Sequence, residues 1–237
     1  MVWGVLLLAC RGPVVAVPTP APVSTHAVVV SERGGTSVGA RLPTVVALHG
    51  LGDRAEDFIH ALDGLSGPVR VVAVQAPEPW GDDGHAWWTR RVSSGDWSAL
   101  AGDVSAAADA LQPLLEQLGN DDSVCGKPVV TGFSQGGMLS FALAGRHPDD
   151  IAGAVPVSGM VLDGVATSPW APTRALHGDA DTVVPFEATR AAVDALTAAG
   201  EDVSLQAFVG VQHRIPSPVR QAWFRELQGL LPTCVGE

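Results

Sequence analysis

The chain has 237 residues, of which 46% are hydrophobic and 16% charged, a size and composition that suit one α/β domain with a sizeable core and exclude intrinsic disorder. Its formal net charge of −11, with Lys127 as the only lysine, argues against binding to nucleic acid or to anionic lipid headgroups. There is no tyrosine, but four of the seven tryptophans fall between Trp80 and Trp97.

The first 25 residues have the features of a leader and a tether. The apolar run Val2–Cys10 is about half as long as a membrane-spanning helix, and Leu7-Leu8-Ala9-Cys10 resembles a bacterial lipobox without the usual basic residues in front. Residues 12–24 hold four prolines among small residues, which suits an extended tether. We expect residues 1–25 to make the protein exported or a lipoprotein, tethered to a membrane through lipidated Cys10. The alternative is an N-terminal tail without a targeting role.

From residue 26 onward, short apolar runs alternate with segments of helical periodicity, as in a parallel sheet covered by helices on both faces. The expected strands are His26–Glu32, Thr44–Leu48, Val69–Val74, Lys127–Phe133, Gly153–Val157, Arg174–His177 and Val203–Phe208. The expected helices are Ala55–Leu65, Ala99–Leu118, Gln135–Arg146, Phe186–Ala199 and Pro218–Leu230. The pattern therefore predicts one α/β domain over residues 26–237.

A long insertion, residues 75–98, separates the third expected strand from the second expected helix. Insertions of this length in a compact domain are usually functional loops. Trp87 and Trp88 lie in it and could line a substrate pocket or pack the loop onto the domain. Of the neighbouring Arg90 and Arg91, we expect at least one to pair with a local acid rather than with a substrate anion.

The segment Gly132-Phe133-Ser134-Gln135-Gly136 stands between an expected strand and an expected helix, the setting that gives Gly-x-Ser-x-Gly its meaning. On such a strained turn the serine hydroxyl is exposed, and the flanking glycines leave room for neighbouring backbone. The positive end of the following helix faces the hydroxyl. Ser134 is therefore the candidate nucleophile.

A serine hydroxyl needs a base, and the base needs a carboxylate that fixes its tautomer. His213 follows the last expected strand and is the candidate base, whereas His49 and His177 are expected to be structural at strand ends. Two acids, Asp179 and Asp181, compete for the third role. Asp181 can lean toward the loop of His213, while Asp179 is better placed to brace its own turn.

An oxyanion also needs two backbone N–H donors, one after the nucleophile and one from the loop after an earlier strand. Gln135 supplies the first, and Leu51 in the Gly-rich segment after Leu48 supplies the second. Cys125 and Cys234 form an even pair if Cys10 is lipidated, and we predict that they lie within disulfide range. Neither a Cys-x-x-Cys pair nor helical His and acid spacing indicates a metal site.

Taken together, these motifs resemble the carboxylesterase and acyl-protein thioesterase branch of the α/β-hydrolase superfamily over about residues 40–231. The segments that carry the likeness are Leu48-His49-Gly50-Leu51-Gly52-Asp53, Gly132 to Gly137, His177-Gly178-Asp179-Ala180-Asp181 with Val184-Pro185, and Gly210-x-x-His213. The resemblance implies an α/β-hydrolase fold with a mostly parallel central sheet, helices on both faces and no large cap domain.

The resemblance also implies roles for single residues. Ser134 would be the nucleophile, His213 the base and Asp181 the orienting acid, with Leu51 and Gln135 as the oxyanion donors and no metal or cofactor. The expected substrates are small carboxylic esters or thioesters, with lysophospholipids or acylated proteins as the alternative. Two other classes are a non-catalytic binding protein on a hydrolase scaffold and a metal-dependent hydrolase. The intact set of candidate residues argues against the former, and the spacing of acids and histidines argues against the latter.

Overall fold

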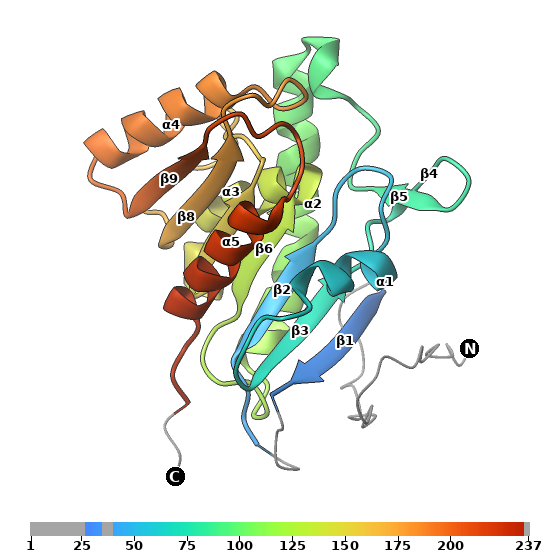
Figure 1. Ribbon diagram of the computed structural model, residues 1–237, viewed down its shortest axis with the longest axis vertical. Coiled ribbons are helices and arrows are strands. Elements are labelled where there is room, and N and C mark those ends of the chain that lie inside the picture. Colours follow the sequence, from blue (N-terminus) through green and yellow to red (C-terminus); the bar gives the residue numbers. More distant parts are fainter. Residues whose placement is uncertain (1–26, 35–39, 235–237) are drawn as a thin grey trace.

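The computed structural model describes residues 27–34 and 40–234 and contains a seven-stranded sheet in the order β1-β3-β2-β6-β7-β8-β9 (Figure 1). The strands are β1 (Val28–Arg33), β2 (Thr44–Leu48), β3 (Val69–Val74), β6 (Val129–Phe133), β7 (Gly153–Val157), β8 (Thr173–Gly178) and β9 (Val203–Phe208). All neighbours are parallel except the edge strand β1, which is antiparallel to β3. Each predicted strand is present, and its ends lie within two residues of the prediction.

Helices cover both faces of this sheet (Figure 1). The α-helices are α1 (Ala55–Phe58), α2 (Trp97–Gly119), α3 (Gln135–Arg146), α4 (Phe186–Ala198) and α5 (Ser217–Leu230), and the 3₁₀ turns are η1 (Ile59–Leu62), η2 (Val92–Ser94) and η3 (Pro148–Asp150). The buried side chains of α1 and α5 share one cluster, and those of α2, α3 and α4 share the other. The predicted α/β arrangement with helices on both faces is therefore confirmed.

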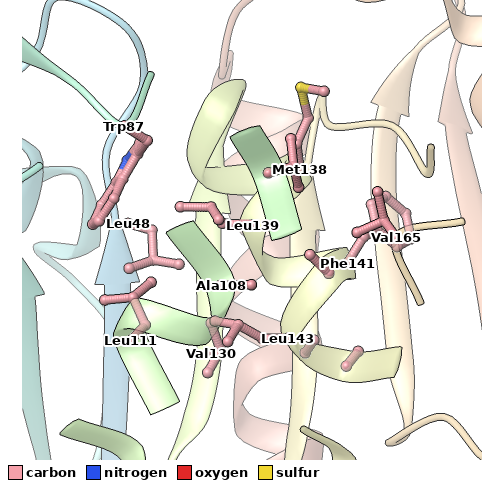
Figure 2. Packing of buried hydrophobic residues seen from close by; sticks show 14 of the residues in the cluster. Leu48, Trp87, Ala108, Leu111, Val130, Met138, Leu139, Phe141, Leu143 and Val165 are labelled. Carbon is pink, nitrogen blue, oxygen red and sulfur yellow. The ribbon is translucent and has the colours of Figure 1, made fainter. Parts of the chain in front are cut away.

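The apolar core is divided between the two faces because successive strand residues point in opposite directions. In β2, Val45 and Ala47 pack toward α1 and α5, whereas Val46 and Leu48 pack toward α2 and α3. Figure 2 shows the second cluster, in which side chains of α3 interdigitate with those of α2 and of the central strands. The near-continuous apolar sequences of the central strands follow from this burial on both sides.

Two segments differ from the sequence prediction. The helix predicted over Ala55–Leu65 is a short α-helix continued by the 3₁₀ turn η1, which ends at Leu62 because Asp63 is extended; the chain then turns at Gly64, where φ is +98°. The insertion predicted as a loop contains a two-stranded antiparallel hairpin, β4 (Glu78–Trp80) and β5 (Gly84–Ala86). In Figure 1 this hairpin projects beside α1, away from the main sheet.

The predicted proximity of Cys125 and Cys234 is confirmed, since the two residues form a disulfide with Cα atoms 5.5 Å apart. This bond joins the segment before β6 to the segment after α5. The predicted leader and tether, with Cys10, lie outside the described residues. Within residues 27–34 and 40–234, no helix has both the length and the apolar character needed to cross a membrane.

Candidate active site

Ser134 lies on a strained turn between β6 and α3. Its backbone has φ 59° and ψ −114°, a left-handed region that a residue with a Cβ rarely adopts. This turn is stabilised by the backbone N–H of Ser134, which donates to the carbonyl oxygen of Val157 on the neighbouring strand, at 3.0 Å. A Cβ at Gly132 or at Gly136 would collide with the backbone carbonyl of Leu48. The two flanking glycines therefore let the turn lie directly against the end of β2, as their sequence spacing predicts.

His213 and Asp181 complete a hydrogen-bonded chain with Ser134. The His213 Nδ1 lies 2.6 Å from Oδ2 of Asp181, and its Nε2 lies 3.0 Å from the Ser134 hydroxyl oxygen. Because a carboxylate only accepts, Nδ1 carries the proton and Nε2 is left to accept the serine proton. Phe133 packs against the His213 ring with its centroid 4.7 Å away. The three candidates thus come from the carboxyl ends of β6, β8 and β9.

The Asp181 side chain is fully buried, and its carboxylate is held by several donors. Its Oδ1 accepts from the backbone N–H groups of Val183 and Val184, at 2.9 and 3.0 Å. Burial alone would raise the pKa of this carboxyl, but hydrogen bonds from His177, His213 and the Val184 N–H hold the pKa well below its usual range. Asp181 is therefore ionised at neutral pH.

A second histidine, His177, also reaches this carboxylate, which the sequence alone did not predict. Its Nε2 lies 3.3 Å from Oδ2 of Asp181 and 3.1 Å from the carbonyl oxygen of Val184. Both groups accept, so Nε2 carries the proton. The competing acid Asp179 instead accepts from the Gly210 N–H at 2.6 Å and so braces the loop that leads to His213.

The two candidate oxyanion donors flank the serine. Gln135 is the first residue of α3, where backbone N–H groups have no acceptor within the helix. Leu51 belongs to the loop after β2, and a Cβ on the adjacent Gly50 would lie 3.5 Å from the Cβ of Ser134. In the described part of the chain, neither N–H donates to another protein group. Both N–H groups are thus free of a protein acceptor in this part of the chain.

Trp87 and Trp88 are buried packing residues, only 4% and 6% exposed. Trp87 packs in the same cluster as Leu48, beside which it lies in Figure 2. Both residues also border an open groove of about 520 Å³ between the insertion and α2, whose lining includes Glu78 and Asp103 but not Ser134. Ser134 does not line this groove, so a pocket-lining role of the two tryptophans stays a prediction.

The two arginines of the insertion contact neighbouring side chains of the protein. Arg90 lies 3.0 Å from Asp103 and 3.6 Å from Asp96, as predicted for a structural arginine. Arg91 lies over the Trp80 ring, 5.2 Å from its centroid. Both arginines therefore have partners within the protein.

The other described histidines differ in exposure. His60 is exposed, His85 is half-buried in β5, and His147 packs against Asp109 with its side chain 12% exposed. No group of three or more metal-ligating side chains occurs among the described residues. His49 is buried at the end of β2, where burial lowers its pKa and keeps the ring neutral.

Comparison with known proteins gives a consistent result. The profile of the Phospholipase/Carboxylesterase family matches residues 26–222. The crystal structure of esterase PE8 superposes with a TM-score of 0.71, at 25% identity and with 85% of this chain and 99% of that chain covered. At lower identity, the Zea mays acyl-protein thioesterase 2 (22% identical, 87% and 98% covered, TM-score 0.63) and the Bacillus cereus carboxylesterase (18% identical, 86% and 96% covered, TM-score 0.66) share the fold.

Curated relatives align over a smaller part of their own length. NocK of Nocardia uniformis subsp. tsuyamanensis, a candidate esterase by its name, is 29% identical over 168 residues, which are 66% of this chain and 45% of NocK. The chloroplastic protein PHYLLO of Arabidopsis thaliana is 29% identical over 138 residues, which are 57% of this chain and 7% of PHYLLO. The chain thus spans less than half the length of these two relatives.

Proposed function

The chain belongs to the phospholipase/carboxylesterase family, and from this membership and the site geometry we propose that it is a serine hydrolase of carboxylic esters or thioesters. The observation that carries the proposal is the continuous chain from the Ser134 hydroxyl to His213, at 3.0 Å, and from His213 to Asp181, at 2.6 Å. A nucleophile, a base and an orienting acid in this relation are what acyl transfer requires.

In the first step, the Ser134 oxygen attacks the carbonyl carbon of the substrate while Nε2 of His213 takes the hydroxyl proton. The carbonyl electron pair moves onto the oxygen, and the resulting oxyanion accepts from the N–H groups of Leu51 and Gln135. The negative carboxylate of Asp181 stabilises the imidazolium that forms on His213. When the oxyanion collapses, the bond to the leaving alcohol or thiol breaks, and the leaving group takes the proton from His213.

In the second step, water replaces the leaving group. His213 removes a proton from the water as its oxygen attacks the acyl carbon of the Ser134 ester, and the same two N–H groups hold the second oxyanion. Collapse breaks the bond to Ser134, whose oxygen takes back the proton from His213. The acid leaves and the site returns to its first state, so no step needs a metal or a cofactor.

The reacting group is the carbonyl in both substrate classes, so the site geometry suits esters and thioesters alike. Among the structural relatives, one is titled an esterase and another an acyl-protein thioesterase. We take a small-molecule ester as the first candidate substrate, and a lysophospholipid or an acylated protein as the alternative on the same three residues. Attachment to a membrane through Cys10 stays a prediction from the sequence.

Replacing Ser134 by alanine tests the proposal directly. Ser134→Ala should lower hydrolysis of p-nitrophenyl acetate by about 10⁴-fold or more and abolish labelling by a fluorophosphonate probe. A matched control is Ser158→Ala, since Ser158 also has a positive φ, of 47°, and follows the neighbouring strand β7. Retained activity in Ser134→Ala, or labelling mapped to another residue, would refute the assignment.

A profile over acyl chain length then separates the two substrate candidates. Rates are measured over p-nitrophenyl esters of increasing chain length and over a matched thioester. A maximum at short chains favours a carboxylesterase of small molecules, and a maximum at long chains favours the lysophospholipase or acyl-protein thioesterase alternative. A wild-type protein that neither hydrolyses any of these compounds nor reacts with the fluorophosphonate would instead be a binding protein on this scaffold.

A further inference from the structure

The segment of residues 75–88, here called the bracing segment, is bonded to the surroundings of both candidate oxyanion donors. We propose that it holds these two donors in place and that Trp87 is its central positioning residue. The inference rests on the proposed function, since it gives a role to residues around the same site. It develops one of the two alternatives that the sequence left open, the packing of Trp87 onto the domain.

The first bond fixes the peptide unit that precedes Leu51. The backbone N–H of Ala76 donates to Nε2 of His49 at 3.1 Å, so this nitrogen has no proton of its own. The proton of the neutral ring therefore lies on Nδ1, which donates to the Gly50 carbonyl oxygen at 2.7 Å. In a planar trans peptide the C=O and the next N–H point in opposite directions. Holding the Gly50 oxygen thus sets the direction of the Leu51 N–H.

The next peptide unit is held by the hairpin of the bracing segment. The Gly52 N–H donates to the His85 carbonyl oxygen at 2.8 Å, and the His85 N–H donates to the Asp53 carbonyl oxygen at 3.0 Å. A Cβ on Gly84 would collide with the Gly52 backbone, so β5 approaches the loop after β2 as closely as glycine permits. Leu51 therefore lies between two held peptide units: the unit that carries its N–H is held through His49, and the following unit is bonded directly to the bracing segment.

Gln135, the other candidate oxyanion donor, is bonded to the same segment through its buried side chain. Its Oε1 accepts from the Trp87 N–H at 3.0 Å, and its Nε2 donates to the Trp88 carbonyl oxygen at 2.9 Å. This clamp fixes the residue whose own backbone N–H is the second oxyanion donor. Both polar atoms of the buried amide thus bond to the insertion, which explains why a long polar side chain is stable there.

Trp87 connects the two halves of the arrangement. Its backbone N–H binds Gln135, and its indole N–H donates to the His49 carbonyl oxygen at 2.9 Å. The ring also lies against the His49 ring, with centroids 5.7 Å apart. One residue thus links the helix start that carries one donor to the loop that carries the other.

Donors aimed in advance at a developing oxyanion are effective because no reorganisation is needed during the reaction. Removing a whole oxyanion donor costs about 10²–10³-fold in kcat, so loosening two donors should cost about 10–100-fold. The effect should fall on kcat rather than on KM, because the oxyanion forms only after the substrate has bound.

Trp87→Phe keeps an aromatic ring but removes the indole N–H, and Trp223→Phe is its matched control. Trp223 on α5 is fully buried and donates its indole N–H to the Thr131 hydroxyl at 2.6 Å, in the core on the other face of the sheet. Both variants replace the two fused rings of indole by one phenyl ring and remove one buried hydrogen bond, so both should lose stability. Only Trp87→Phe should lower kcat, with KM for p-nitrophenyl acetate changed less than about threefold.

A short alkyl trifluoromethyl ketone gives a second readout, because its adduct with the serine is a tetrahedral oxyanion. Its inhibition constant should rise about 10–100-fold in Trp87→Phe and stay unchanged in Trp223→Phe. If Trp87→Phe does not fold, Gln135→Met serves instead, since it removes the side-chain clamp and keeps the backbone N–H. Unchanged kcat and unchanged ketone affinity in the folded variant would overturn the proposal. Failure of the proposed function is seen separately, as absence of fluorophosphonate labelling at Ser134 in the wild-type protein.

Discussion

The disulfide between Cys125 and Cys234 closes a loop with a sequence separation of 109 residues. In the chain-entropy treatment, a cross-link stabilises the native state by restricting the unfolded chain, and a loop of this length corresponds to about 4.8 kcal/mol at 25 °C. Measured losses on removing such bonds are about 2–5 kcal/mol. We therefore expect Cys234→Ser to lower the free energy of unfolding by about 2–5 kcal/mol.

Of the two single variants, Cys234→Ser perturbs the native state less. Cys234 is half-buried, whereas Cys125 is buried, and a serine hydroxyl placed there would be removed from water. Urea unfolding followed by tryptophan fluorescence measures the loss. Wild-type protein with a reducing agent is the control and should reach the same free energy. The m-value should rise in both, since the unfolded chain exposes more surface without the cross-link.

Activity should not follow stability in this experiment. Cys125 precedes the amino end of β6 and Ser134 follows its carboxyl end, so the two are separated by the length of this central strand, about 16 Å. Without denaturant, kcat of Cys234→Ser should equal that of the wild type. An unchanged free energy of unfolding would contradict the entropy argument, and a large loss of activity in the folded variant would contradict the separation of disulfide and site.

Further outcomes are expected for variants of Asp181 and Gly136 and for the addition of EDTA. Asp181→Asn should lower kcat by about 10⁴-fold, because the His213 tautomer is no longer fixed. Because the pKa of Asp181 is lowered by folding, its contribution to stability is present above the ordinary value of 3.8 and is lost as the pH falls through the native pKa, so Asp181→Asn should flatten the acid side of a plot of unfolding free energy against pH. Gly136→Ala should cost about 1–3 kcal/mol in thermal unfolding, since its methyl group meets the Leu48 carbonyl, whereas Gly102→Ala in α2 has free space and should stabilise by about 0.5–1 kcal/mol. Hydrolysis of p-nitrophenyl acetate should be the same with and without EDTA, and a loss of rate that added Zn²⁺ restores would favour the metal-dependent alternative.

Most of the fold could be predicted because the central strands are buried on both faces and so carry near-continuous apolar sequences. β2 and β3 are examples, in which each residue is buried. The turn at Ser134 was also predictable, since its glycines are required by the close approach of the Leu48 backbone. The position of His213 followed from the chain order, which puts it after the last strand.

The structure of the insertion could not be predicted in the same way. Its hairpin is held by backbone bonds to Gly52 and Asp53, which no side-chain periodicity records. Aromatic composition alone also left open whether Trp87 contacts a ligand or the protein, because both roles require apolar surroundings. The contact between His177 and Asp181 depends on how the turn after β8 folds back, which spacing along the chain does not specify.

The three candidate residues do not rest on equally protected strands. Ser134 follows a strand with neighbours on both sides, whereas His213 follows β9, an edge strand that pairs with β8 alone among residues 27–34 and 40–234. Edge elements open with lower free energy than the centre of a sheet. Local opening of β9 would displace His213, the base, while Ser134 and most of the core stay in place. Heat inactivation should then begin below the melting temperature and reverse on cooling, because it reflects local unfolding of one edge strand and not global unfolding.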